Sequence, residues 1–328
     1  MIRRQTLSLH RSQQSISYYR QRGDGEDALG AESDYFSLLY PHMLIEDVAL
    51  GIMPIGGRAE KRPFRVYLTP PNDQVQKIIA AAIGQRDYSH DFAGAVCDFF
   101  HDCAQLMIAY GEAVYEVVYL SAGEVASPEA FQLVLVQPHT LIHRRGAFVQ
   151  YVPADIAREK RLPRYVRLPA DRLLVFHPPA YVRRKLPQIL DSLAFLSREV
   201  YPEFALRQLE GRSQAGFDST AFMRSQKLAL AEAGTLIGWS ARSLLQEEML
   251  EYYVLDRQLR FERFRIELRN NILAELNRGL TRAGEGIGFS ACIEIEGLPT
   301  LADVAAARAA LASGDRPFKD ILDPFLGF

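Results

Sequence analysis

The sequence has little cysteine and almost no charge imbalance. Its 328 residues include three cysteines, Cys97, Cys103 and Cys292, which are too few and too unevenly spaced for a disulfide framework. Lys and Arg number 38 against 40 Asp and Glu, so the formal net charge is -2. A chain this close to neutral does not have the electrostatics of a protein that coats nucleic acid or an anionic membrane. Any contact of that kind must be local.

A long hydrophobic run is also missing. Asp98, Asp102 and Glu112 interrupt the most apolar region, and no window of about 18 apolar residues is free of charge. A membrane-spanning helix is therefore excluded, and we expect no membrane partner. The chain is nevertheless 48% hydrophobic, which is enough to bury a large core.

The N-terminal residues have basic side chains and lack acidic ones. Residues 1–23 carry five arginines and contain no acid before Asp24. This composition also occurs in transit peptides. We favour a flexible basic arm.

No metal or catalytic motif is complete. Cys97 and His101 lie four positions apart on one helical face, with His90 and Cys103 nearby, but there is no Cys-x-x-Cys pair, so buried thiols are the simpler interpretation. Asp98 and Asp102, with Asp91 before them, suggest a magnesium cluster. They lack a further ligand and a basic phosphate clamp, so the solvated side of a helix explains them better.

Two glycine-containing stretches are also poor candidates for chemistry. Gly284 to Gly288 follows a predicted helix and precedes a predicted strand, the reverse of what phosphate binding at a helix N-terminus requires. Gly238 to Arg242 lacks the final glycine of a nucleophile elbow. We therefore expect no catalytic residue, no metal and no cofactor.

The residue pattern predicts a β-rich segment between helices. A helix is expected at 92–110, and at Gly111 the hydrophobic period changes from helical to strand-like. Strands are expected at 113–120, 131–136, 148–152, 164–168 and 173–176, the last one ending before Pro178. Closely spaced glycines and prolines are typical of a small sheet or barrel.

The rest of the chain is predicted to be mostly helical. A strand is expected at 64–68, and Pro41 should interrupt any long helix within 35–53. Helices are expected at 72–84, 186–211 with a kink at Pro202, 220–236, 243–280 and 301–312, and a further strand at 287–295. The fold class is therefore α+β.

Basic residues gather in or next to the β-rich segment. They form three groups, Arg144-Arg145, 158–164 and 183–185, with tyrosines between them. Such clusters indicate a local contact with nucleic acid or an acidic protein, although solvated surface charge is the plainer interpretation.

This arrangement resembles the portal proteins of tailed bacteriophages. The likeness lies in the sequence from Leu106 to Val118, which ends a helix and begins a strand, in the strand Asp171 to His177, and in the segment Ala312 to Asp320. It follows the order of elements from about residue 64 to residue 320.

The resemblance implies a portal-like α+β fold, in which a small β-rich clip is inserted between two stem helices. Its parts would be a flexible basic arm (1–34), an N-terminal wing part (35–91), a stem helix (92–112), the clip (113–178), a second stem helix (179–212), a tunnel loop (213–219), wing helices and a strand (220–300), and a C-terminal helix and tail (301–328). The candidate tunnel-loop residues are Ser213, Gln214, Ala215, Gly216, Phe217 and Asp218. The candidate partner contacts in the clip are Arg144, Arg145, Arg158, Lys160, Arg161 and Arg164.

The resemblance also implies a function without catalysis. Portal proteins form a closed homo-oligomeric ring, usually of twelve copies, at one capsid vertex. Double-stranded DNA passes through the ring during packaging and ejection, and terminase, adaptor or head-completion proteins and the major capsid protein bind it. The location would be the virion, and the host cytoplasm during assembly. The alternatives are a metal-dependent nuclease or transferase using Asp98, His101 and Asp102, and a non-viral adaptor or scaffold protein.

Overall fold

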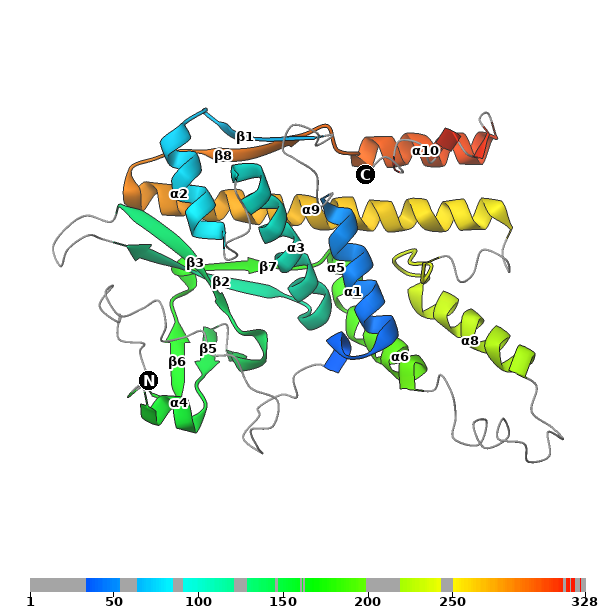
Figure 1. Ribbon diagram of the computed structural model, residues 1–328, viewed down its shortest axis with the longest axis horizontal. Coiled ribbons are helices and arrows are strands. Elements are labelled where there is room, and N and C mark those ends of the chain that lie inside the picture. Colours follow the sequence, from blue (N-terminus) through cyan, green and yellow to red (C-terminus); the bar gives the residue numbers. More distant parts are fainter. Residues whose placement is uncertain are drawn as a thin grey trace. The chain divides into compact units, whose positions relative to one another are not determined.

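The computed structural model (Figure 1) describes residues 34–53, 64–84, 91–120, 129–144, 147–159, 161, 163–198, 219–242 and 250–314, and the positions 317, 318, 320, 321 and 325. These residues fall into two units. The first contains the described parts of Ile55–His177 and Asn271–Gly297, and the second those of Asp34–Pro54, Pro178–Asn270 and Leu298–Phe328. Both units contribute to an α+β chain.

The first unit is built on a three-stranded antiparallel sheet. Strand β2 (Ala113–Leu120) lies between β3 (Ala130–Val136) and β7 (Leu173–Phe176). Helix α3 (Phe92–Tyr110) packs on the sheet through Phe99, whose ring centroid is 5.1 Å from that of Tyr115 and 5.7 Å from that of Phe176. Aromatic side chains from one helix and two strands therefore form the centre of this core.

The predicted helix at 92–110 and the strand that follows it are confirmed. Asp91 caps the start of α3 by accepting a hydrogen bond from the Gly94 backbone N–H at 2.6 Å. The helix ends at Gly111, which adopts the left-handed conformation with a φ of 80°. Strand β2 begins two residues later, so a single glycine redirects the chain from helix to sheet.

A second three-stranded sheet follows in the same unit. It consists of β4 (Leu141–Arg144), β5 (Ala147–Tyr151) and β6 (Tyr165–Leu168), with the short helix α4 (Ala154–Glu159) between β5 and β6. Val152, Val166 and Leu168 are buried in one cluster with Val114 and Leu173 of the first sheet. The expectation of one small sheet or barrel is thus corrected to two sheets that share a core. Strand β4 was not predicted from the sequence.

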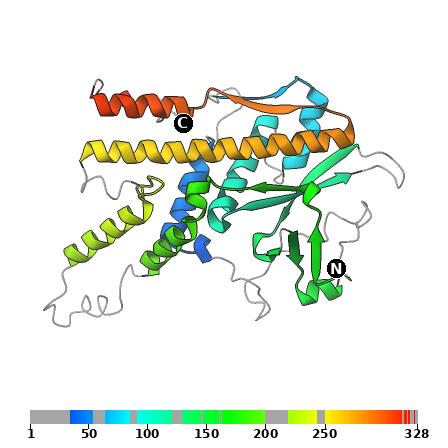
Figure 2. The same ribbon diagram turned by 180° about the vertical axis from the view of Figure 1, so that it is seen from behind.

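A two-stranded ribbon completes the first unit. Strand β1 (Arg65–Thr69) pairs with β8 (Cys292–Glu296), and the two strands lie side by side in both views of the chain (Figures 1 and 2). Helix α2 (Asp73–Ile83) follows β1 and is capped by Asn72, which accepts hydrogen bonds from two backbone N–H groups. The strand predicted at 287–295 is wrong at its start, because helix α9 (Glu251–Ile287) continues to Ile287.

The second unit is helical in its described residues. It contains α1 (Leu39–Ile52), α5 (Ala180–Arg183), α6 (Leu186–Arg198), α8 (Ser219–Gly234), the part of α9 up to Asn270, and α10 (Leu301–Ser313). The prediction that Pro41 interrupts a long helix is wrong, because Pro41 lies in the first turn of α1. A backbone N–H has no partner within the helix at that position, so proline removes no bond.

Side chains of α9 and α10 form the largest part of the core at one end of this unit. Leu255, Leu259 and Ile266 of α9 pack with Val304 and Leu311 of α10. The expected i,i+4 ridge of α9 is buried along its length. The predicted helix at 301–312 is confirmed as α10.

The kink at Pro202 and the candidate tunnel loop Ser213–Asp218 lie outside the described residues, as do 243–249.

Candidate interaction surfaces

Three of the arginines predicted to bind partners, Arg158, Arg161 and Arg164, lie between the start of α4 and the start of β6. Arg158 is exposed at the end of α4, and Arg161 is exposed in the turn that follows, with a φ of 51°. Arg164 is also exposed, and its guanidinium donates a hydrogen bond to the Tyr151 hydroxyl and lies over the Tyr151 ring, 5.3 Å from the centroid. Arg145, Lys160 and the side chain of Arg144 lie outside the described residues.

The exposed Tyr165 extends this basic surface, and the buried Tyr151 supports it. The ring centroids of Tyr151 and Tyr165 are 5.6 Å apart, and Tyr165 is 42% exposed. The Val152 N–H donates to the Arg164 carbonyl at 2.8 Å, which holds the backbone before β6 against the end of β5. Exposed arginine beside an exposed aromatic ring suits an acidic protein segment or a nucleic-acid strand chemically.

Glu112 joins the end of helix α3 to both sheets. Its carboxylate Oε1 lies 2.6 Å from the Nε2 atom of His143 in β4, and its Oε2 lies 3.8 Å from the Nδ1 atom of His177, next to β7. The Glu112 side chain is only 15% exposed. The His143 ring also contacts Phe148 of β5 with centroids 4.7 Å apart. This connection could not be predicted from the sequence, because the three residues are far apart along the chain.

The residues considered for metal binding on α3 do not gather around a common point. Cys97 and Cys103 are buried, and the Cys103 thiol donates to the Met107 sulfur at 3.7 Å. Burial, with a smaller effect from the charge of Asp102, raises the pKa of Cys103 well above its usual value, which disfavours the thiolate that a metal requires. No group of three or more His, Cys, Asp or Glu side chains in the described part of the chain is placed to hold a metal ion. His90 is outside that part.

The segment from Gly238 to Arg242 has a structural role in the second unit. Trp239 is buried, and its carbonyl accepts hydrogen bonds from the Arg257 guanidinium at 2.6 and 2.9 Å. Burial lowers the pKa of Arg257 to about 10. Arg242 pairs with Glu46 and Asp47 of α1. This segment therefore fastens α1 to α9.

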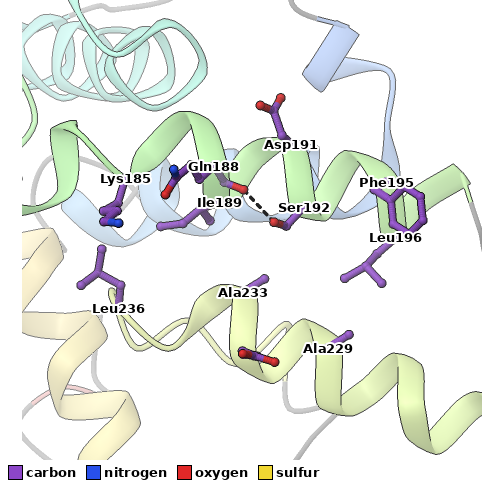
Figure 3. A pocket seen from close by; sticks show the side chains of 11 residues that line it. Lys185, Gln188, Ile189, Asp191, Ser192, Phe195, Leu196, Ala229, Ala233 and Leu236 are labelled. Carbon is purple, nitrogen blue, oxygen red and sulfur yellow. Dashed lines mark hydrogen bonds between the residues drawn. The ribbon is translucent and has the colours of Figure 1, made fainter.

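An apolar groove lies between α6 and α8 (Figure 3), with a volume of about 810 Å³. Ile189, Phe195 and Leu196 of α6 face Ala233 and neighbouring residues of α8 across it. Phe195 is 63% exposed, and Leu236 at the end of the groove is 42% exposed. Its charged lining residues are Lys185, Asp191 and Glu232. We call this site the α6–α8 groove; the hydrophobic pattern predicted the helices but not the space between them.

The start of the described chain is attached to the α6 side of the groove. The Tyr35 hydroxyl donates to the Asp191 carboxylate at 2.6 Å, and the Tyr40 N–H donates to the Ser197 hydroxyl at 3.0 Å. Burial, followed by the hydrogen bond and the charge of Asp191, raises the pKa of Tyr35 to about 12. These two bonds hold residues 35–40 against α6.

Comparison with known proteins gives one kind of match. No protein-family model and no curated protein matches the chain. Among solved structures, the chain is similar to a protein chain from the "Virion of native gene transfer agent (GTA) particle", with a TM-score of 0.49 and 12% sequence identity. The similarity covers 86% of this chain and 89% of that one. No helix in the described residues is both long enough and apolar enough to cross a membrane.

Proposed function

We propose that this chain is the portal subunit of a tailed bacteriophage, forming a ring at one capsid vertex through which DNA is packaged and ejected. The observation that supports the proposal is the order of elements. Helix α3 ends at Gly111, and the described residues between Ala113 and Phe176 form six strands. After Pro178 and Pro179 the chain returns to helix in α5 and α6. In this proposal α3 and α6 are the stem helices and the β-rich segment is the clip.

The packing of the strands narrows the part of the clip that is available to partners. The β2–β3–β7 sheet is covered by α3, so its residues are needed for the core. The β4–β5–β6 sheet with α4 carries the exposed Arg158 and Arg161. We assign the binding of terminase and of adaptor or head-completion proteins to this second sheet, because exposed arginines favour acidic partners.

Ring assembly requires a contact in which one face of a subunit binds a different face of the next. Leu250 and the first turn of α9 offer an apolar surface for this contact. Leu250 is 73% exposed, Tyr253 55% and Tyr252 42%. Three large apolar side chains exposed on one helical turn are typical of an interaction site. We call this set the α9 start.

The charge of the chain suits a conduit for DNA. Every lysine or arginine that holds a phosphate adds salt-dependent affinity, which would oppose passage. With a net charge of -2, the chain has no excess of positive charge for such a grip. The proposed role as a conduit needs no catalytic residue and no cofactor.

The test is the native mass of the purified protein. We expect a particle of about twelve times the 37.0 kDa subunit mass, with a central opening in negative-stain images. A folded species of 37.0 kDa at every concentration, checked by circular dichroism, would overturn the proposal. Loss of a divalent metal-dependent nuclease activity on substituting Asp98, His101 and Asp102 together would favour the enzyme alternative instead.

A further inference from the structure

The α6–α8 groove is an open apolar surface within its own subunit. Phe195 and Leu236 lie at opposite ends of the groove and are both exposed, and the buried Ile189 lines it between them (Figure 3). An apolar surface that stays open in this way and is edged by charged residues is typical of an interaction site.

The α9 start is the second exposed apolar surface of the same unit. No other stretch of four residues among the described residues of this unit exposes three large apolar side chains, as Leu250, Tyr252 and Tyr253 do. None of the three lines the groove. Both surfaces therefore remain uncovered in a single chain, and neither covers the other within one copy.

We propose that the α9 start of one copy binds in the α6–α8 groove of the next copy, head to tail. A groove and a different surface that fills it form a heterologous contact, and such a contact closes into a ring when it is repeated by rotation. The inference rests on the proposed ring and names the two surfaces that would join its subunits.

The charges inside the groove favour an occupant that is mainly apolar. Lys185 and Glu232 carry opposite charges in the lining, and Figure 3 shows the Asp191 side chain pointing away from α8. Asp191 is also occupied by the Tyr35 hydroxyl. Glu232 is exposed, and it can accept hydrogen bonds from tyrosine hydroxyls. Tyrosine is therefore a suitable side chain for this groove.

Positive charge next to the groove favours the α9 start in particular. Arg183 and Arg184 directly precede Lys185, and all three side chains are exposed without an ion-pair partner in the part of the chain that the structure describes. Glu251, between Leu250 and the two tyrosines, is likewise exposed and without such a partner there. Binding would bring this carboxylate beside the basic end of the groove.

The size of the contact is that of an anchor within a larger interface. The groove volume of about 810 Å³ lies in the range of roughly 300–1,000 Å³ found for sites that enclose a drug-sized ligand. A tyrosine buries roughly 150–250 Å² in full, so the half-exposed Tyr252 and Tyr253 offer roughly 200 Å² together. A stable interface takes about 800 Å² from each partner. Two tyrosines therefore supply about a quarter of it, as binding hot spots do.

Disulfide trapping in the full chain tests the contact. The exposed native thiol is first removed by Cys292→Ser, while Cys97 and Cys103 are buried and remain. Leu250→Cys, which keeps both tyrosines, is then combined in the same chain with Ala233→Cys in the groove. Oxidation should link each copy to the next and give a ladder of covalent oligomers on a denaturing gel.

The matched control combines Leu250→Cys with Ala305→Cys on the exposed side of α10, and circular dichroism checks that every variant is folded. We expect far less linkage from this pair. Equal linkage from both pairs would overturn the proposal. Linked dimers without higher oligomers would overturn it too, since they indicate a reciprocal contact, as would a link formed within one copy.

Charge exchange gives an independent readout. Lys185→Glu should slow formation of the ladder roughly two- to fivefold, the effect of one exposed ion pair, and Glu251→Lys in the same chain should restore the rate. An unchanged rate in Lys185→Glu contradicts the proposed orientation.

Failure of this contact is distinct from failure of the portal proposal. A ring in negative-stain images whose copies do not link through Leu250→Cys and Ala233→Cys would overturn the contact alone. A covalent ladder from a protein that forms only open chains would leave the contact standing and overturn the portal proposal.

Discussion

The Trp239 indole N–H donates a hydrogen bond to the Asp47 carboxylate at 2.8 Å, joining two residues that are 192 positions apart. Trp239 is 1% exposed. The other carboxylate oxygen of Asp47 accepts from the Arg242 Nε at 2.8 Å, and its backbone carbonyl accepts from Arg265 at 2.5 Å. Asp47 is thus the residue of α1 at which the α8–α9 connection and α9 are both bound.

Asp47→Ala should destabilise the second unit strongly. The substitution leaves the buried Trp239 N–H without an acceptor and Arg242 without its less exposed partner. We expect the free energy of unfolding to fall by about 2–3 kcal/mol, as for hydrogen bonds to a charged group. Glu46→Ala is the matched control, since the Glu46 side chain is 40% exposed and its pair should contribute less than about 1 kcal/mol. Urea unfolding followed by Trp239 fluorescence measures both, and equal losses would refute the role of Asp47.

Gly238→Ala should cost more than Gly288→Ala, although both glycines have a positive φ. An added Cβ at Gly238, with a φ of 82°, would lie 2.3 Å from the Arg257 carbonyl oxygen. At Gly288, with a φ of 91°, it would meet nothing within 4 Å. The left-handed conformation alone costs about 1–2 kcal/mol for alanine, and the clash at Gly238 should add about 1–3 kcal/mol. Denaturation followed by circular dichroism gives both values; similar losses would mean that α9 shifts to admit the methyl group.

The Tyr35–Asp191 hydrogen bond should make stability depend on alkaline pH. The folded pKa of Tyr35 is raised to about 12 by burial, and then by Asp191, while the unfolded value is 10.0. Between these values the unfolded chain loses the proton first, so the unfolded state gains stability as the pH rises. The contribution of Tyr35 is therefore complete below pH 10 and is lost toward pH 12. Urea midpoints from pH 8 to 11.5 should fall less for Tyr35→Phe than for the unchanged protein, and parallel curves would exclude this linkage.

Substitution in the α9 start should weaken ring assembly. The Tyr252 and Tyr253 rings contact each other with centroids 5.4 Å apart. If neighbouring subunits bury this surface, Leu250→Ser or Tyr253→Ser should raise the protein concentration needed for assembly by about 10- to 100-fold, the value of one buried large side chain. Leu301→Ser, which changes a 40% exposed leucine on α10, is the control. Native mass measurements over a dilution series give the protein concentration at which each variant assembles. If neither α9 substitution changes this concentration, the contact lies elsewhere.

The sequence predicted the elements best where a glycine or proline coincided with a change in the spacing of the apolar residues. Gly111 separates the helical spacing of α3 from the β-branched and aromatic residues of β2, and both elements have the predicted bounds. Strand β7 likewise ends just before His177 and Pro178. At these places the local conformational preference and the tertiary packing agree.

Prediction failed where packing overrode local preference. Gly284 and Gly286 predict the end of a helix, yet both lie within α9, at positions where neighbouring atoms leave no room for a side chain. A Cβ on Gly286 would lie 2.8 Å from the Tyr119 ring. Pro41 likewise predicts an interruption, whereas the first turn of α1 accepts it.

The candidate surfaces were harder to predict than the elements. Helical spacing places Ile189 and Phe195 on α6, but it cannot show that Phe195 stays exposed beside α8. Glu112 was recognised only as a charge within an apolar region, because its contacts with His143 and His177 depend on the arrangement of two sheets. The basic residues of the second sheet were found because they cluster in sequence, as Arg158 and Arg161 do.

The pairing of β1 with β8 has a consequence for biosynthesis. Tyr67 in β1 donates hydrogen bonds from its hydroxyl to Glu294 and Glu296 in β8, 227 and 229 positions later. At roughly 5–20 residues per second, a ribosome needs roughly 10–45 s to make the intervening chain. Throughout that interval the nascent β1 strand has no partner edge, so this ribbon closes only after nearly all of the polypeptide has been translated.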